Sequence, residues 1–375
     1  MGNGPRGLAS DIAGGRSMRR IQYKPKEPEP PTWVEFTGRT GEWFGIWIVN
    51  VALTIATLGI FSAWAKVRRK KYFAQNTLID GKRFDYHATG GQILLGRVIV
   101  IGAYLAINLI LALNPFMGIF LLGLPFVMPW LTIRALKFNA RQTSWANVRF
   151  DFQGRYGEAL LLFTVAPIGM MLTLWLALPV VSIAIRKFTI GNHSLGRSRF
   201  NFEGAFGAFY AAFGLAALWL LIVAGGVAVF VIMPAFGFLL ESALTEEFNP
   251  GAIGVIVMGL YIVLIVGLVP ARIIYAAFLR NAVFAGISLD KHRFGSVISP
   301  PRYIWIAMSN AVAIALTLGL AVPWAQIRMA RYLSYNTAVL PDGPIATFAG
   351  KVRAEGSAVG DAAMDLEGID IGLPV

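Results

Sequence analysis

Seven long apolar segments constrain the fold of this chain more than any other feature. The hydrocarbon core of a bilayer is about 30 Å thick, and an α-helix needs roughly 20 apolar residues to cross it. The chain is 56% hydrophobic and only 14% charged, whereas soluble domains are roughly 25% charged. We therefore expect a multi-pass membrane protein, with membrane segments at about 43–64, 93–113, 115–133, 159–180, 208–234, 251–271 and 303–324.

The charge of the chain indicates what its polar parts face. The formal net charge is +13, which in a membrane protein is typical of loops at the anionic cytoplasmic surface. We therefore expect anionic lipid headgroups, and no nucleic acid, as partners. The chain has no cysteine, so it forms neither disulfides nor thiolate sites. Residues 1–31 lack apolar periodicity, residues 351–375 are small and acidic, and both stretches are predicted to be disordered tails.

One phrase of sequence recurs at the two ends of the apolar region. "WAKVRRKKYFAQNT" runs from Trp64 to Thr77, and "WAQIRMARYLSYNT" runs from Trp324 to Thr337. Such self-similarity is typical of a protein built from repeated units. It predicts five copies of one unit, in which a membrane helix is followed by a cationic helix extension and a β-hairpin. Three weaker copies lie at 130–152, 185–202 and 279–294.

Each copy ends in a pattern typical of a β-hairpin. In the first copy Asp80-Gly81 separates two short strands, and Asp-Gly is among the strongest short hairpin signals. We expect antiparallel pairing of 78–79 with 82–84, and the same arrangement across Asp342-Gly343. Because a lone hairpin is only marginally stable, the hairpins should pair with one another or with 33–38, forming small sheets against the membrane.

The first copy carries a family resemblance. The stretch 36–90, which contains "TLGIFSAWAKVRRKKYFAQNTLIDGKRFDYHATG", resembles the YjgN family of bacterial inner-membrane proteins, also described as a domain of unknown function. The resemblance extends over about 33–350 and is most specific at 64–90. It implies a multi-pass protein of the bacterial inner membrane. The family has no established activity, so the resemblance assigns no catalytic residues.

The lengths of the apolar segments predict seven spans. Seven spans would place the first, second and fifth hairpins on one side of the membrane and the other two on the opposite side. The halves at about 36–150 and 150–294 would then be inverted, as in many transporters, and a final unit would follow at 295–350. The expected fold is therefore an all-α polytopic membrane protein with small interfacial β-hairpins, about seven membrane segments and one repeated domain at 32–350.

The charges favour a different topology. All five copies are basic, so the positive-inside rule puts every hairpin in the cytoplasm. In that alternative only four segments span the membrane, and 43–64, 159–180 and 303–324 are re-entrant. Their apices would lie near Asn50, Pro167 and Asn310.

Two sets of polar residues are candidates for function. Arg68 and Lys71 fall on one helical stripe with Trp64, at i+4 and i+7, and could contact lipid headgroups or an anionic solute. The alternative is that such cations only snorkel and fix the topology. The mid-membrane asparagines either form interhelical hydrogen bonds or line a polar path. The first set is Trp64, Arg68, Lys71, Asn76, Trp324, Arg328, Arg331 and Asn336, and the second is Asn50, Asn108 and Asn310.

No catalytic pattern accompanies these residues. The three histidines are scattered over separate loops, and the sequence contains no HExxH, P-loop or nucleophile-elbow motif. We expect no enzyme, metal or cofactor. The leading hypothesis is a transporter or channel for a small anionic or amphipathic solute. The alternative is a non-transporting membrane scaffold or lipid-binding protein that uses its basic interfacial hairpins. The sequence leaves the oligomeric state open.

Overall fold

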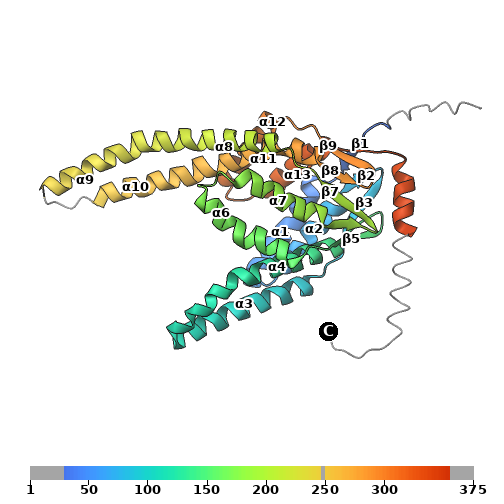
Figure 1. Ribbon diagram of the computed structural model, residues 1–375, viewed down its shortest axis with the longest axis horizontal. Helices are drawn as coiled ribbons and strands as arrows, with labels where there is room; N and C mark the ends of the chain where they lie inside the picture. Colours follow the sequence, from blue (N-terminus) through green and yellow to red (C-terminus); the bar gives the residue numbers. More distant parts are fainter. Residues whose placement is uncertain (1–28, 246–249, 355–375) are drawn as a thin grey trace, which may run out of the picture.

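Ten short strands close into an antiparallel β-barrel, and pairs of helices leave the barrel at one end (Figure 1). The computed structural model describes residues 29–245 and 250–354. The prediction of an all-α fold is therefore wrong. Around the barrel the order is β1-β10-β9-β8-β7-β6-β5-β4-β3-β2. The strands are β1 (Thr32–Phe36), β2 (Thr77–Ile79), β3 (Lys82–Tyr86), β4 (Thr143–Trp145), β5 (Val148–Phe152), β6 (His193–Leu195), β7 (Ser198–Phe202), β8 (Ile287–Leu289), β9 (His292–Ser296) and β10 (Thr337–Leu340).

The predicted hairpin of the first copy is confirmed. Leu78 pairs with Arg83 and Ile79 with Lys82 in an antiparallel register. At the turn, Asp80 and Gly81 have φ of 52° and 68°, the left-handed conformation that Asp and Gly tolerate in a two-residue hairpin loop. The preference of these two residues for positive φ therefore fixes the position of this turn.

The barrel is closed by the N-terminal strand. β1 pairs with β2 on one side and with β10 on the other, so the prediction that the hairpins pair with 33–38 is confirmed. The predicted hairpin across Asp342-Gly343 is wrong, because β1 occupies the edge of β10 where a returning strand would lie. The chain instead forms a helix at 345–354. Pro344, which precedes it, lacks the N–H that a ladder requires.

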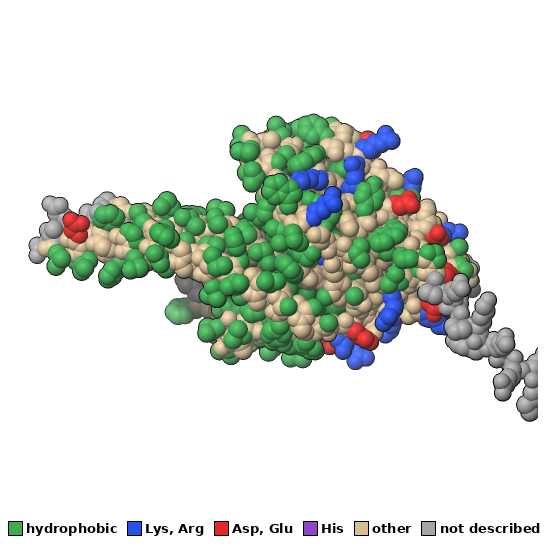
Figure 2. Space-filling view, turned by 90° about the horizontal axis from the view of Figure 1, so that it is seen from above, with side chains coloured by type: hydrophobic (Ala, Val, Ile, Leu, Met, Phe, Trp, Pro, Cys, Tyr) green, Lys and Arg blue, Asp and Glu red, His purple; other side chains and the backbone are tan. Residues whose placement is uncertain are grey.

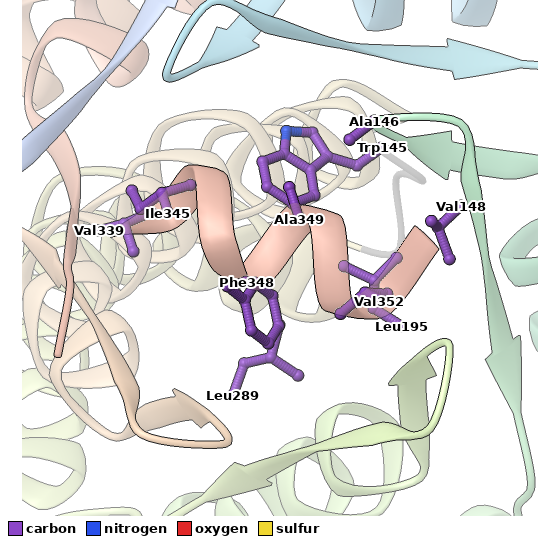
Figure 3. Packing of buried hydrophobic residues seen from close by; sticks show 10 residues of the cluster. All are labelled: Trp145, Ala146, Val148, Leu195, Leu289, Val339, Ile345, Phe348, Ala349 and Val352. Atoms are coloured by element: carbon purple, nitrogen blue, oxygen red, sulfur yellow. The ribbon is translucent and has the colours of Figure 1, made fainter. Parts of the chain in front are cut away.

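One level of apolar side chains lines the barrel interior around a cavity of about 120 Å³. Phe84, Phe150, Phe200 and Phe294 come from successive long strands, and their ring centroids lie 6.4, 6.2 and 6.1 Å apart, which suits attractive ring packing. The helix 345–354 covers the turn end of the barrel and packs Phe348 and other side chains onto this level (Figure 3). Residues 351–354, assigned to a tail by the sequence, are the last turn of this helix.

Each helical connection begins and ends on neighbouring strands at the opposite end of the barrel. Phe36, which ends β1, pairs with Thr77, which begins β2, and the register repeats this arrangement at the other four junctions. The short connections are α1 (Thr40–Ala56) with α2 (Ser62–Gln75), α5 (Tyr156–Leu160) and α6 (Ala166–Leu172) with α7 (Leu178–Gly191), and α12 (Pro300–Leu316) with α13 (Val322–Tyr335). The long connections are α3 (Gly90–Leu113) with α4 (Leu124–Arg141), and α8 (Phe206–Val227) and α9 (Met233–Thr245) with α10 (Pro250–Ile262) and α11 (Val269–Ala285).

This geometry overturns the prediction of about seven spans. A connection that returns to the barrel end from which it left crosses a membrane an even number of times. Among the described residues four helices are long and apolar enough to cross, and each long connection supplies two of them: Gly90–Leu113, Phe116–Arg141, Phe206–Leu244 and Ile253–Ala285. In Figure 2 hydrophobic side chains cover the projecting long connection, while Lys and Arg gather nearer the barrel.

The three remaining apolar segments are broken helices. Thr57 ends the first arm of α1/α2, and Leu58 and Gly59 follow with φ of 49° and 92°. The Thr57 hydroxyl donates to the Leu53 carbonyl and accepts from the Phe61 N–H, so it supplies partners that the broken helix lacks. The other two breaks follow Thr173 and Thr317 with the same hydroxyl bonds.

The predicted apices at Asn50, Pro167 and Asn310 are therefore wrong. Each apex lies seven residues beyond the Asn, or six beyond the Pro, at a Thr followed by a leucine with positive φ. An elbow needs residues in the left-handed region and hydrogen-bond partners at the break. Each break has a leucine in that region and a threonine hydroxyl that bonds on both sides, whereas Asn50, Pro167 and Asn310 lie within helices.

Gly59→Ala tests the elbow. A Cβ at Gly59 meets no atom within 4 Å, so the change acts through backbone strain alone. We expect it to destabilise the protein by about 1–2 kcal/mol, seen as a lower melting temperature in detergent. The same change at Gly214, in mid-helix with equally open surroundings, should leave the melting temperature unchanged or raise it. Equal losses at both positions would contradict the elbow.

Single cysteines test the side on which the hairpins lie. Arg83 and Arg199 are exposed at matching places on β3 and β7, and the chain has no native cysteine. Because both lie on one barrel and the basic hairpins favour the cytoplasm, an impermeant thiol reagent should label Arg83→Cys and Arg199→Cys only after cells are permeabilised. Glu241→Cys, near the far tip of the long connection, should be labelled in intact cells. Different accessibility of positions 83 and 199 would refute the shared side.

Candidate functional site

Two short helical hairpins carry matching cationic grooves. The groove of α12/α13 has a volume of about 640 Å³, and that of α1/α2 about 460 Å³. Arg328, Arg331 and Tyr332 hold the same places in one repeated phrase as Arg68, Lys71 and Tyr72 in the other. The larger groove is lined by residues that include Arg302, Trp305, Trp324, Arg328, Arg331 and Asn336, and the smaller by Gly45, Val49, Arg68, Lys71, Tyr72 and Gln75.

The helical period places these cations in the grooves. Trp324, Arg328 and Arg331 follow one another at i, i+4 and i+7 and share a face of α13. Ala325, on another face, is buried, whereas the buried Ile327 lines the groove beside these cations. The larger groove therefore runs along the stripe of α13 that carries Trp324, Arg328 and Arg331.

Arg328 is held by neutral oxygens. One of its Nη atoms donates to Ser309 Oγ at 2.8 Å and to Asn310 Oδ1 at 3.0 Å, and the guanidinium lies 5.0 Å from the centre of the Trp324 ring. Asn310 is buried and donates to the Ala325 carbonyl at 3.1 Å. These contacts orient Arg328 but leave its charge without a counter-ion in the groove.

Arg68 repeats this arrangement in the smaller groove. Its Nη1 donates to Oδ1 of the buried Asn50 at 3.3 Å, and its guanidinium lies 5.1 Å from the Phe61 ring. Asn50 and Asn310 thus bond between the two arms of their hairpins. Asn108 does not, because it is exposed on α3 and donates to the Tyr104 carbonyl of its own helix.

The two hairpins are neighbours across the closure of the barrel. Trp43 of α1 donates through Nε1 to Gln326 of α13 at 2.8 Å, and Arg331 donates to the Gly38 carbonyl at 3.0 Å. Lys71 is exposed in the smaller groove. The two grooves therefore lie on adjacent hairpins that are in direct contact.

Trp64 and Asn76 lie outside the smaller groove. The Trp64 ring stacks on Phe61 at 5.9 Å and covers Gly90, where a Cβ would lie 2.3 Å from the indole. Asn76 donates to the Tyr72 carbonyl at the end of α2 and accepts from the Thr37 hydroxyl. Their roles are to pack α2 against α3 and to join α2 to the end of β1.

Two tyrosines of the grooves, Tyr72 and Tyr332, are not among the residues predicted from the sequence. Tyr72 both accepts from the Arg39 N–H at 2.9 Å and donates to the Arg39 carbonyl at 3.0 Å, and Tyr332 makes the same two bonds with Ser299 at 3.0 Å. Burial raises the pKa of the Tyr72 hydroxyl, so it remains a donor at neutral pH. The signal was present in the sequence, because both repeated phrases contain Arg-x-x-x-Tyr.

The chemistry of the grooves suits an anion. Within the described part of the chain no carboxylate lines either groove, although Glu42 lies 3.3 Å from the Tyr72 hydroxyl. Arg binds phosphate and carboxylate groups through paired N–H donors, and Trp305 and Trp324 suit the membrane–water boundary. Among the described residues no group of three or more His, Cys, Asp or Glu could hold a metal ion.

Comparisons with known proteins agree with a membrane protein of unassigned activity. Residues 31–366 match the model of a family described as bacterial protein of unknown function (DUF898). The chain is 26% identical to "Inner membrane protein YjgN" of Salmonella typhimurium over 82% of this chain and 88% of that one. It is 33% identical to the protein of the same name from Escherichia coli K12, over 36% of this chain and 35% of that one. No solved structure matches.

Tyr332→Phe tests how the larger groove is fixed. The change removes a hydroxyl that makes two hydrogen bonds to Ser299, and each bond is worth roughly 1 kcal/mol. We expect a melting temperature several degrees lower. Tyr335→Phe, at a 58% exposed residue in the same groove, should have almost no effect. An unchanged melting temperature for Tyr332→Phe would show that the hydroxyl does not hold α13 to the start of α12.

Proposed function

Because this chain belongs to the DUF898 family of bacterial proteins of unknown function, with relatives named as inner membrane proteins, we propose that it is an inner-membrane protein that binds anionic phospholipid headgroups. The observation that carries the proposal is the pair of cationic grooves on adjacent short hairpins. Both grooves hold an Arg oriented by a buried Asn, and their described lining residues include no carboxylate.

The position of these cations along the hairpin supports binding at headgroup depth. Nine residues separate Gly59 at the elbow from Arg68, which is about 14 Å of helix. This length is close to half of the roughly 30 Å hydrocarbon core. A hairpin whose elbow reaches the middle of the bilayer therefore brings Arg68 to the headgroups. The elbow itself suits lipid, since Leu58 and Leu318 are each 95% exposed.

The fold does not support the transporter hypothesis. That hypothesis depended on inverted halves, which an odd number of crossings per half would produce, and every described connection returns to the barrel end from which it left. Movement of a small anionic or amphipathic solute stays a prediction. The lipid-binding alternative now has the stronger support, because its residues converge in defined grooves.

Paired charge removal tests the proposal. Each cation near an anionic surface is worth about 1 kcal/mol, so Arg328→Gln with Arg331→Gln should weaken binding of phosphatidylglycerol about 30-fold at that groove. The measurement is retention of phosphatidylglycerol against phosphatidylcholine by the detergent-purified protein in native mass spectrometry.

The matched control removes the same charge elsewhere. Arg83→Gln with Arg199→Gln changes two exposed arginines on the barrel wall and should leave phosphatidylglycerol retention unchanged. If the control pair lowers retention as much as the groove pair, net charge and not the grooves attracts the lipid, and the proposal is wrong.

A further inference from the structure

The four consecutive cations of α2, Arg68 to Lys71, divide between two faces of the helix. Arg68 and Lys71 line the smaller of the two grooves described above, which are called the outer grooves from here on. Arg69 and Lys70 line a second groove on α2, the inner groove, of about 650 Å³. Successive residues of a helix point about 100° apart, so a continuous run of four cations cannot face one side. The run therefore supplies two sites of different surroundings, and sequence periodicity centred on Trp64 identified one of them.

The second groove lies on the opposite face of the α12/α13 hairpin from the larger outer groove. Its walls come from α12 residues such as Ala307, Ala311 and Ile314 and from Met329 and Leu333 of α13, none of which line the outer groove. Along α12 these residues run from the barrel toward the elbow at Leu318. The apolar part of the groove thus extends in the direction of the membrane.

Arg69 and Lys70 form its cationic end without a counter-ion. Lys70 donates from Nζ to Asn139 Oδ1, and its ammonium lies 4.8 Å from the Tyr86 ring. Burial, with repulsion from Lys66 and Arg69, lowers the pKa of Lys70. Among the described residues neither Arg69 nor Lys70 is in a salt bridge. A bound anion would relieve this crowding.

Other hairpins place cations at the same position. Lys70, Arg186 and Arg280 each stand seven residues before the first residue of a short strand. Arg186 and Arg280 each retain a buried Nε without a hydrogen-bond partner in the described structure. Three connections therefore place a positive charge at the same distance from the barrel, and of these three cations Lys70 lines the second groove.

The polar residues of the wall are already engaged. Asn310 accepts from Arg328 and donates to the Ala325 carbonyl, and Gln326 accepts from Trp43. The wall therefore offers a ligand mainly apolar contact, and Arg69 and Lys70 supply the positive charge. This arrangement fits a molecule with one small anionic head and an apolar tail.

We propose that the inner groove binds a long-chain fatty acid, with its carboxylate at Arg69 and Lys70 and its acyl chain along α12 and α13 toward the elbow. A groove of this volume lies within the range of about 300–1,000 Å³ that encloses small ligands. It suits one acyl chain with the smallest of lipid heads, and not the two chains and larger head of a phospholipid. The proposal is independent of headgroup binding at the outer grooves.

Two pairs of substitutions on α2 test this site with matched charge. The detergent-purified protein is incubated with oleate, and retention is followed by native mass spectrometry. Arg69→Gln with Lys70→Gln should lower oleate retention at least tenfold, while Arg68→Gln with Lys71→Gln should leave it unchanged. Equal losses from both pairs, or none from the inner pair, would overturn the proposal.

A wall variant guards against a folding defect of the charge variants. Ala311→Phe keeps all four cations and fills the apolar groove, so oleate retention should fall while phosphatidylglycerol retention and melting temperature stay unchanged. Retention of oleate by this variant would overturn the proposal.

A competition experiment tests the head of the ligand. If lysophosphatidylglycerol displaces bound oleate and palmitate does not, the groove selects a phosphate head and not a carboxylate, and the proposal is wrong. If Arg68→Gln with Lys71→Gln lowers phosphatidylglycerol retention and leaves oleate retention unchanged, the result supports headgroup binding at the outer grooves and a separate oleate site.

Discussion

The pairing of β1 with both β2 and β10 is the contact on which the rest of the structure depends. It joins the first strand to the last and removes the open edges that a sheet of ten short strands would otherwise expose. Closure also fixes where each connection begins and ends, because its two junction residues face one another at one end of the barrel. The even number of crossings, the common side of the hairpins and the adjacency of the first and last helical hairpins all follow.

Closure also brings the two outer grooves together. The arms α1 and α13 belong to opposite ends of the chain, yet the Trp43–Gln326 bond and the Arg331–Gly38 bond join them beside β1. Within the first of these hairpins, α2 places Arg68 and Lys71 in one groove and Arg69 and Lys70 in another. A single helix thus contributes cations to two grooves with different surroundings.

The elbows and the long connections divide the membrane contacts. The two long connections supply the helices that match a bilayer in length, whereas the three broken ones end in leucines held at positive φ and capped by a threonine hydroxyl. Such an elbow leaves few unsatisfied backbone groups, which is a requirement for any non-helical backbone at membrane depth. The short hairpins can therefore carry their cations to a membrane surface without crossing it.

By itself the sequence determined the local features: the apolar segments, the turn at Asp80-Gly81, the cationic stripe of Arg68 and Lys71, and the family. Each depends on residues close together in the chain, where helical period and turn preference act. Tertiary structure alone decided the barrel, the return of each connection to the barrel end from which it left, and the inner groove. Four of the strands have only three residues, too few for a periodic signal. The elbow at 57–61, "TLGIF", is as apolar as the helices that flank it, so its sequence does not show that the helix breaks there. The pairing of β1 with β10, and the groove that Arg69 and Ala311 both line, depend on contacts between residues far apart in the chain. No local pattern specifies such contacts.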